Sequence, residues 1–294
     1  YVTTEEMPRI YMLEGHDELS FEPAFTSAIE KANVDYETIN LLNYDTVPED
    51  ADCVILNAPA RDLSNDDTEK LLSYMEKGGD VLIISTYTDA EMPNFSRLLD
   101  FYGLEITKGL IIEADNNFYY QDPFYLFPEI SYDDITDSVT GSGSFVFVPY
   151  AKGITIMDQE NVSATPLLTT SDESYARSDI SAGGVYAKQE GDIDGPFHAG
   201  VKCEKEVEGE ISTAVVYGSE YLFTQNADEI VSGTNLMLFA GTLGSFESYT
   251  DSIVVPVKSY EFSYIAMPQS SIVFLALATV IVLPFGFLIN GFGI

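Results

Sequence analysis

The residues with the clearest scope for chemistry follow the first apolar run of the chain, at 10–13. Gly15, His16 and Glu18 stand just after this run, where a strand is expected to turn toward a helix. A histidine beside a carboxylate can act as a general base or form a ligand-binding corner. The alternative is structural: His16 hydrogen-bonds the backbone of its loop, and Glu18 lies near a helix start. We predict the structural role and keep the three residues as ligand-binding candidates.

A second candidate site is the aromatic stretch at 116–128, in which Tyr119 and Tyr120 are neighbours. Aromatic rings offer flat apolar faces, so a surface that binds carbohydrate or serves in adhesion is one interpretation. The other interpretation is that these rings pack against a neighbouring sheet. We predict packing, with sugar binding through Tyr119 and Tyr120 as the alternative.

The motifs of several large enzyme classes are missing from the sequence. No G-x-x-x-x-G-K-[ST] loop occurs, so we expect no ATP hydrolysis. The G-x-G-x-x-G fingerprint and the G-x-S-x-G nucleophile elbow are also absent. Cys53 and Cys203 are predicted to be small buried residues, and no metal-ligand set is recognisable. We predict no catalytic residue, metal or cofactor; the enzymatic alternative is a degenerate amidotransferase-like hydrolase centred on His16.

The charge balance excludes one class of partner. The 294 residues include 13 Lys+Arg and 48 Asp+Glu, which gives a net charge of −35. Binding to nucleic acid requires a basic surface that neutralises phosphates, so no nucleic-acid partner is expected. Apolar residues make up 46% of the chain, enough for a packed core.

The elements that would position the candidate residues alternate between strand and helix at 8–105. Apolar runs predict strands at 9–13, 36–41, 54–56 and 80–85, and amphipathic patterns predict helices at 21–32, 64–77 and 93–102. This alternation is typical of a mostly parallel sheet with helices on both faces, a Rossmann-like α/β unit.

A β-rich stretch is predicted to interrupt this sheet at 105–200. Short β-like runs occur at 110–112, 144–148 and 153–156, and the polar stretch 171–184 resembles a loop. The α/β pattern returns at 200–250, with a strand at 211–217 and a helix at 234–246. We therefore predict one α/β domain over 1–250 with a β-rich insertion.

The end of the chain has a different composition. Residues 266–294 contain no Asp, Glu, Lys or Arg. A helix of about 20 mostly apolar residues is long enough to cross a bilayer. We predict a transmembrane helix at 266–294, joined by a linker at 251–265 and holding the protein at the cell membrane.

Ordered motifs along the chain resemble one family, the gliding-motility-type (Gld) auxiliary components of ABC transporters. In the first half these motifs are YMLEGHDE at 11–18, INLL at 39–42, VPEDAD at 47–52, NAPARDLS at 57–64 and LSYMEKGG at 72–79. In the second half they are TPLLTTS at 165–171, GPF at 195–197, VYGS at 216–219 and VPVK at 255–258.

This resemblance implies an extracytoplasmic domain similar to class I glutamine amidotransferase-like α/β folds, which also has relatives in intraflagellar transport proteins. It implies a non-catalytic, membrane-anchored auxiliary or binding subunit. The implied partners are an ABC-2-type permease and a separate ATPase subunit. The missing nucleophile elbow agrees with a binding role rather than an enzymatic one.

Overall fold

The computed structural model describes residues 7–246, except positions 33, 89, 142 and 181–185. The chain divides into two units, 1–257 and 258–294, and every described residue belongs to the first. Both the linker predicted at 251–265 and the transmembrane helix predicted at 266–294 lie outside the described residues. Within the part that is described, no helix is long and apolar enough to cross a membrane.

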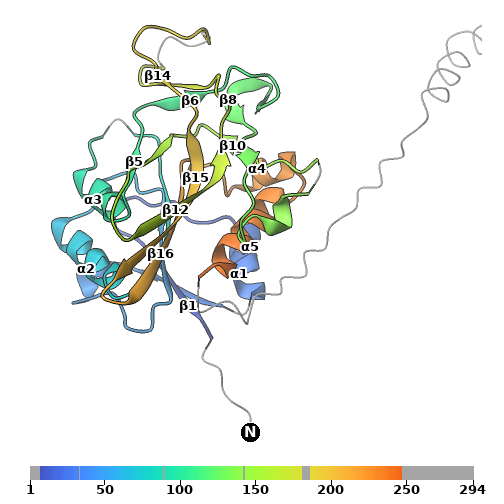
Figure 1. Cartoon of the computed structure of the whole chain (residues 1–294). Helices are drawn as coiled ribbons and strands as arrows, with labels where there is room; N and C mark the ends of the chain where they lie inside the picture. Colours follow the sequence, from blue (N-terminus) through green and yellow to red (C-terminus); the bar gives the residue numbers. More distant parts are fainter. Residues whose placement is uncertain (1–6, 33, 89, 142, 181–185, 247–294) are drawn as a thin grey trace, which may run out of the picture. The chain divides into compact units, whose positions relative to one another are not determined.

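A large mixed sheet forms the centre of the domain (Figure 1). Five of its strands are parallel, in the order β2 (Asp35–Ile39), β1 (Arg9–Leu13), β3 (Cys53–Asn57), β4 (Asp80–Ile84) and β16 (Glu210–Tyr217). Antiparallel strands extend the sheet beyond β16, namely β15 (His198–Val207), β11 (Ile154–Ile156), β5 (Leu104–Ile106), β12 (Val162–Thr169) and β9 (Glu129–Ile130). The predicted α/β class with a mostly parallel central sheet is therefore confirmed.

Helices cover both faces of the parallel strands (Figure 1). One face packs against α1 (Pro23–Lys31) and α5 (Thr234–Gly244), with the short α4 (Gln225–Ile230) beside α5. The other face packs against α2 (Asn65–Met75) and α3 (Pro93–Phe101). Single-turn 3-10 helices occur at η1 (Leu41–Asn43) and η2 (Asp137–Val139).

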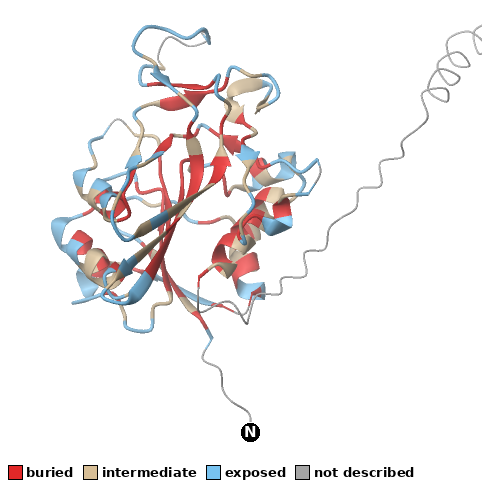
Figure 2. Cartoon of the chain, viewed as in Figure 1, coloured by how far each residue is buried: buried red, intermediate tan, exposed pale blue. Residues whose placement is uncertain are grey.

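The two central strands are buried along their whole length (Figure 2). Every residue of β3 and β4 is buried, as the continuous apolar runs in their sequences predict. The edge strand β2 is instead exposed at all but its last residue. Cys53 and Cys203 are both buried and free, which confirms the prediction for each.

The β-rich stretch forms two small sheets on the side where the parallel strands end (Figure 1). One contains β10 (Val148–Pro149), β8 (Asp122–Leu126) and β7 (Tyr119–Tyr120), and the other contains β14 (Ile193–Asp194), β13 (Tyr175–Arg177) and β6 (Leu110–Ile112). Backbone contacts tie this stretch to the end of β16: the Lys152 N–H donates to the Gly218 carbonyl at 2.8 Å.

Three local predictions need correction. The polar stretch 171–184 is not only loop, because Tyr175–Arg177 forms the buried strand β13, and Arg177 pairs with Asp192 at 2.6 Å. The sequence around Tyr175–Arg177 is polar, so it lacks the apolar pattern that would predict a buried strand. In the run 144–148 only residue 148 belongs to a strand, since the preceding residues pack as irregular chain. The strand predicted at 36–41 ends at Ile39, where Asn40 caps a 3-10 turn by accepting from the Leu42 N–H.

A buried side chain fastens the β-rich stretch to the helical layer. Asn235 on α5 is fully buried, and its Oδ1 accepts from the Phe147 N–H at 3.0 Å. Its Nδ2 donates to the carbonyls of Phe147 and Leu222, at 2.8 Å each. One amide thus satisfies three backbone groups that have left regular structure.

Replacing this amide should destabilise the domain. In Asn235→Ala the buried backbone groups of Phe147 lose their partners, so we expect the free energy of unfolding to fall by roughly 3 kcal/mol. Urea unfolding of the two proteins measures the difference. The control is Asn117→Ala, which removes an exposed amide that bonds only Asp115 and should change stability by less than about 0.5 kcal/mol. Equal effects of the two substitutions would contradict the role given to Asn235.

Candidate functional site

The loops after β1 and β3 meet at the carboxyl edge of the sheet, where the topology predicts a crevice. β1 leads to α1 on one face, whereas β3 leads to α2 on the other. Adjacent parallel strands whose connections leave to opposite faces open such a crevice, and ligands of open α/β sheets usually bind there. His16 and its neighbours occupy this position.

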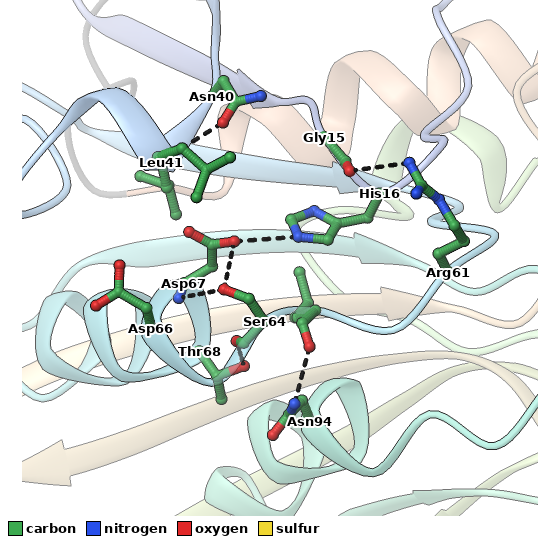
Figure 3. A network of polar contacts seen from close by, with 12 residues as sticks. Gly15, His16, Asn40, Leu41, Arg61, Ser64, Asp66, Asp67, Thr68 and Asn94 are labelled. Atoms are coloured by element: carbon green, nitrogen blue, oxygen red, sulfur yellow. Dashed lines mark hydrogen bonds and ion pairs between the residues drawn. The ribbon is translucent and has the colours of Figure 1, made fainter.

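The His16 imidazole lies between two carboxylates. Its Nδ1 is 3.0 Å from Glu18 Oε1, and its Nε2 is 3.1 Å from Asp67 Oδ2. The His16 backbone N–H also donates to Glu18 Oε2 at 2.7 Å. Figure 3 shows the ring directed at Asp67 from the loop that follows β1. The network therefore joins the first strand's loop to α2.

Helix α2 places Asp67 through its N-terminal cap. The Ser64 Oγ accepts from the Asp67 N–H at 3.0 Å and donates to Asp67 Oδ2 at 2.7 Å (Figure 3). An acidic residue in the first turn is also favoured by the helix dipole. The second carboxylate oxygen, Asp67 Oδ1, is buried without a hydrogen-bond partner. Local sequence thus orients one oxygen toward His16.

Hydrogen bonding and charge favour the protonated imidazole of His16, and burial opposes it. The side chains of His16, Glu18 and Asp67 are only 10%, 5% and 3% exposed. The hydrogen bond to Glu18 raises the pKa of His16 above its ordinary 6.5, against the opposing effect of burial. Burial alone would raise the pKa of Glu18, but hydrogen bonds from the His16 ring and backbone outweigh it and lower that pKa below 4.5. Both shifts favour a protonated imidazole beside an ionised Glu18 carboxylate.

This geometry corrects the contacts expected for the pair. The imidazole bonds two side-chain carboxylates rather than loop backbone, and Glu18 bonds His16 rather than a helix start. Helix α1 begins after Glu22, whose side chain makes no cap bond. Both ring nitrogens of His16 are occupied, so a general base would first have to lose a partner. The arrangement suits a structural tie.

Gly15 contributes backbone conformation to the same loop. Its φ is +127°, which lies in a region of backbone conformation that residues other than glycine rarely adopt. Its carbonyl accepts from Arg61 at 3.2 Å (Figure 3), and Arg61 also forms an ion pair with Asp17. A Cβ at Gly15 would also come within 3.2 Å of the Asn40 side chain. The position therefore requires glycine for shape rather than for ligand contact.

The aromatic candidates form a separate group on β7. Tyr119 is half-buried and its hydroxyl donates to Asn116, while Tyr120 is 40% exposed. Tyr120 contacts the Phe127 ring, which also touches Phe145, itself 48% exposed. Ring packing on Phe127 accounts for part of this cluster, while Tyr120 and Phe145 keep part of their side chains exposed. Neither tyrosine makes a hydrogen bond or ring contact with the His16 network among the residues described.

The sequence analysis does not identify Asp67 as part of the site. It falls at the start of the helix predicted at 64–77, and the signal that points to it is an acidic residue at the third position after the cap at Ser64. The second histidine, His198, lies apart and bonds Thr169 through Nδ1 at 3.1 Å. In the described part of the chain, no group of three His, Cys, Asp or Glu residues is arranged to hold a metal ion.

The protein has a mixed α/β fold. The side chains of His16, Glu18 and Asp67 occupy the place between β1 and β3 where sheets of this kind usually bind ligands. The chain belongs to the family described as "ABC-type uncharacterized transport system", whose model matches residues 7–238. It is accordingly an auxiliary component of an ABC-type transport system, a setting that implies transporter partners and a membrane context.

Solved structures share the fold at low identity. The mmIFT52 N-terminal domain matches with a TM-score of 0.56 and 13% identity, over 83% of this chain and 97% of that one. Exo-beta-1,4-mannosidase Op5Man5 from Opitutaceae bacterium strain TAV5 matches at 0.39 and 13%, over 82% and 36%. PurLQS from Thermotoga maritima matches at 0.37 and 11%, over 81% and 98%. The first match shows a common fold, and the other two carry no argument. No curated protein matches the sequence.

The His16 network predicts a distinctive pH dependence of stability. Because the pKa of His16 is raised, its contribution is complete below its ordinary 6.5 and is lost as pH rises through the folded value. Because the pKa of Glu18 is lowered, its contribution is complete above 4.5 and is lost as pH falls through the folded value. In His16→Gln the buried carboxylates lose their cation, so the free energy of unfolding should fall by about 3 kcal/mol between those pH values.

The measurement is urea unfolding of wild type and His16→Gln at about pH 5.5 and 8.5, on either side of the ordinary histidine pKa. The difference between them should shrink at the higher pH. His198→Gln is the control: burial lowers the pKa of His198, so wild type should gain stability relative to this variant as pH rises. A His16→Gln difference that stays constant over this range would show that the ring is not charged in the folded protein.

Proposed function

We propose that this chain is a membrane-anchored, non-catalytic binding subunit of an ABC-2-type transporter of the gliding-motility type. The observation that carries the proposal is the family match across 7–238, which spans most of the described domain. The order of the Gld-like motifs supports the finer assignment. The uncharged stretch at 266–294 supports an anchor in the membrane.

The partners of the proposal are a permease and a separate ATPase subunit. The chain has no phosphate-binding loop, so the energy for transport would come from another subunit. The resemblance supports an extracytoplasmic position and an amidotransferase-like variant of the α/β fold. The role of binding rather than chemistry is supported by His16, because both its nitrogens are engaged by carboxylates.

The full chain should therefore be recovered from membranes together with its partners. With an affinity tag on the full chain and a mild detergent, we expect one polytopic protein and one protein with a phosphate-binding loop to co-purify, identified by mass spectrometry. A chain that ends at residue 257 should no longer be recovered in the membrane fraction, because it lacks the uncharged stretch at 266–294. The proposal would be refuted if the full chain were recovered in the soluble fraction without detergent. It would also be refuted if the chain purified from membranes with neither of the two partner proteins.

A second candidate function, glycan binding, is favoured by the exposed rings near β7. Tyr120 and Phe145 are 40% and 48% exposed, and both contact Phe127. Large exposed aromatic surfaces often mark interaction sites. The described residues thus offer a strip of two partly exposed aromatic side chains on which a sugar could stack.

Glycan binding through this strip would depend on the exposed ring. On a glycan array, Tyr120→Ala should lose at least about tenfold in affinity for any glycan bound, because stacking on an aromatic face is removed. The matched control is Tyr132→Ala, since Tyr132 is 76% exposed but has no ring contact with this cluster. Absence of glycan binding by wild type, or equal loss in both variants, would reject this candidate.

A further inference from the structure

A second crevice opens at the carboxyl ends of β4 and β16. These strands are parallel neighbours, with Tyr217 paired to Ile84 at the edge. β4 leads to α3 on one face of the sheet, and β16 leads to α4 and α5 on the other. The same topological argument that places a crevice beside His16 therefore applies here. A pocket of about 570 Å³ lies at this position.

The segment that carries Lys152 is fixed along one side of this pocket. Its neighbours are held by backbone bonds, from the Thr107 N–H to the Gly153 carbonyl and from the Ile111 N–H to the Ala151 carbonyl, both at 2.8 Å. Close approach is possible because residue 218 is glycine: a Cβ there would lie 2.1 Å from the Lys152 carbonyl oxygen. The backbone beneath the lysine is thus held in place.

Lys152 is an amine that pairs with no carboxylate in the part of the chain that the structure describes. It lines the pocket and is half-buried, and no described residue forms an ion pair with it. Burial lowers its pKa. Lys31, Lys77 and Lys108 also form no ion pair among the described residues, but they are exposed to water, and Lys205 bonds the Phe101 carbonyl. Lys152 thus differs from them in being partly buried without such a partner. The other described cations pair with carboxylates, namely Arg9, Arg61, Lys70, Arg97, Arg177, Lys188 and Lys202.

The remaining lining is rich in hydroxyl groups. Ser85 follows β4 directly, and its Oγ is buried without a hydrogen-bond partner. Thr86, Thr88 and Ser96 also line the pocket, beside the apolar Phe95 and Ile106. The N-terminus of α3 is not available to a ligand, because the Asp62 carboxylate accepts its Asn94 and Phe95 N–H groups.

The charged lining determines which anion fits best. Lys152 and the exposed Lys108 contribute two positive charges, and the exposed Glu91 contributes one negative charge. The described lining residues thus carry a net charge of +1, and the Glu220 carboxylate, which accepts from the Thr86 hydroxyl at 2.6 Å, adds a negative charge behind them. This balance matches a single carboxylate better than a phosphate dianion. The Ser85 hydroxyl, which has no partner, suits a ligand that itself carries hydroxyls, and the volume suits a molecule of monosaccharide size.

We propose that this pocket binds a small hydroxylated monocarboxylate, with the Lys152 ammonium as the counter-charge of its carboxylate. The inference does not rest on the proposed transporter role, because it concerns the chain alone. The bound carboxylate would pair with the partly buried Lys152 ammonium, which has no carboxylate partner among the described residues. Lys108 lies at the exposed rim and contributes less.

The test is isothermal titration calorimetry of the full chain in detergent, with glucuronate and gluconate as probes and glucose as the neutral control. We expect at least one of the two carboxylates to bind with a dissociation constant below about 10 mM, and glucose not to bind. Lys152→Met should weaken this binding at least about tenfold, because a charge-assisted hydrogen bond is removed. Lys31→Met removes an exposed charge on α1 and should leave it unchanged.

Two further measurements guard against a folding defect in Lys152→Met. Lys152→Arg keeps the charge and should bind more tightly than Lys152→Met. In wild type, the bound carboxylate should slow acylation of Lys152 by a lysine reagent, followed by peptide mass spectrometry, and leave Lys31 unaffected. The proposal is overturned if neither carboxylate binds, if glucose binds equally well, or if Lys152 is not protected. These outcomes leave co-purification with a permease untouched.

Discussion

The double-sided burial of β3 and β4 is the constraint on which the rest of the structure depends. Strands without an exposed face require helices above and below them, and α1 with α5 supply one layer while α2 with α3 supply the other. Some connections must then leave the sheet toward one face and some toward the other. Crevices open where this happens, between β1 and β3 and between β4 and β16. The unusual polar residues of this protein lie at these two places.

The two crevices are filled differently. In the first, the His16 cation is held between Glu18 and Asp67, so the protein's own charges satisfy one another and the loop after β1 is tied to α2. In the second, Lys152 lines a pocket and has no acidic partner among the residues described. A strongly acidic chain could easily have supplied a carboxylate there. Leaving the amine unpaired is what makes the second crevice receptive to an anion.

The β-rich stretch gives the domain its second crevice. Its segment at 150–153 runs across the end of β16, and Asn235 holds the Phe147 backbone against the helical layer. Without this insertion the carboxyl ends of β4 and β16 would lose the wall that carries Lys152. Family membership places residues 7–238, which include this stretch, in an ABC-type transport system.

The sequence by itself determined the features that depend on neighbouring residues. Apolar runs marked β3 and β4, the Ser64 cap marked the start of α2, and Pro93 marked the start of α3, since periodicity and capping act within a few residues. Only the tertiary structure decided which side chains meet. His16 and Asp67 are 51 positions apart, and β13 is buried although its surroundings are polar. Such contacts depend on which strands become neighbours and on which face each helix covers, and a pattern within a few residues specifies neither.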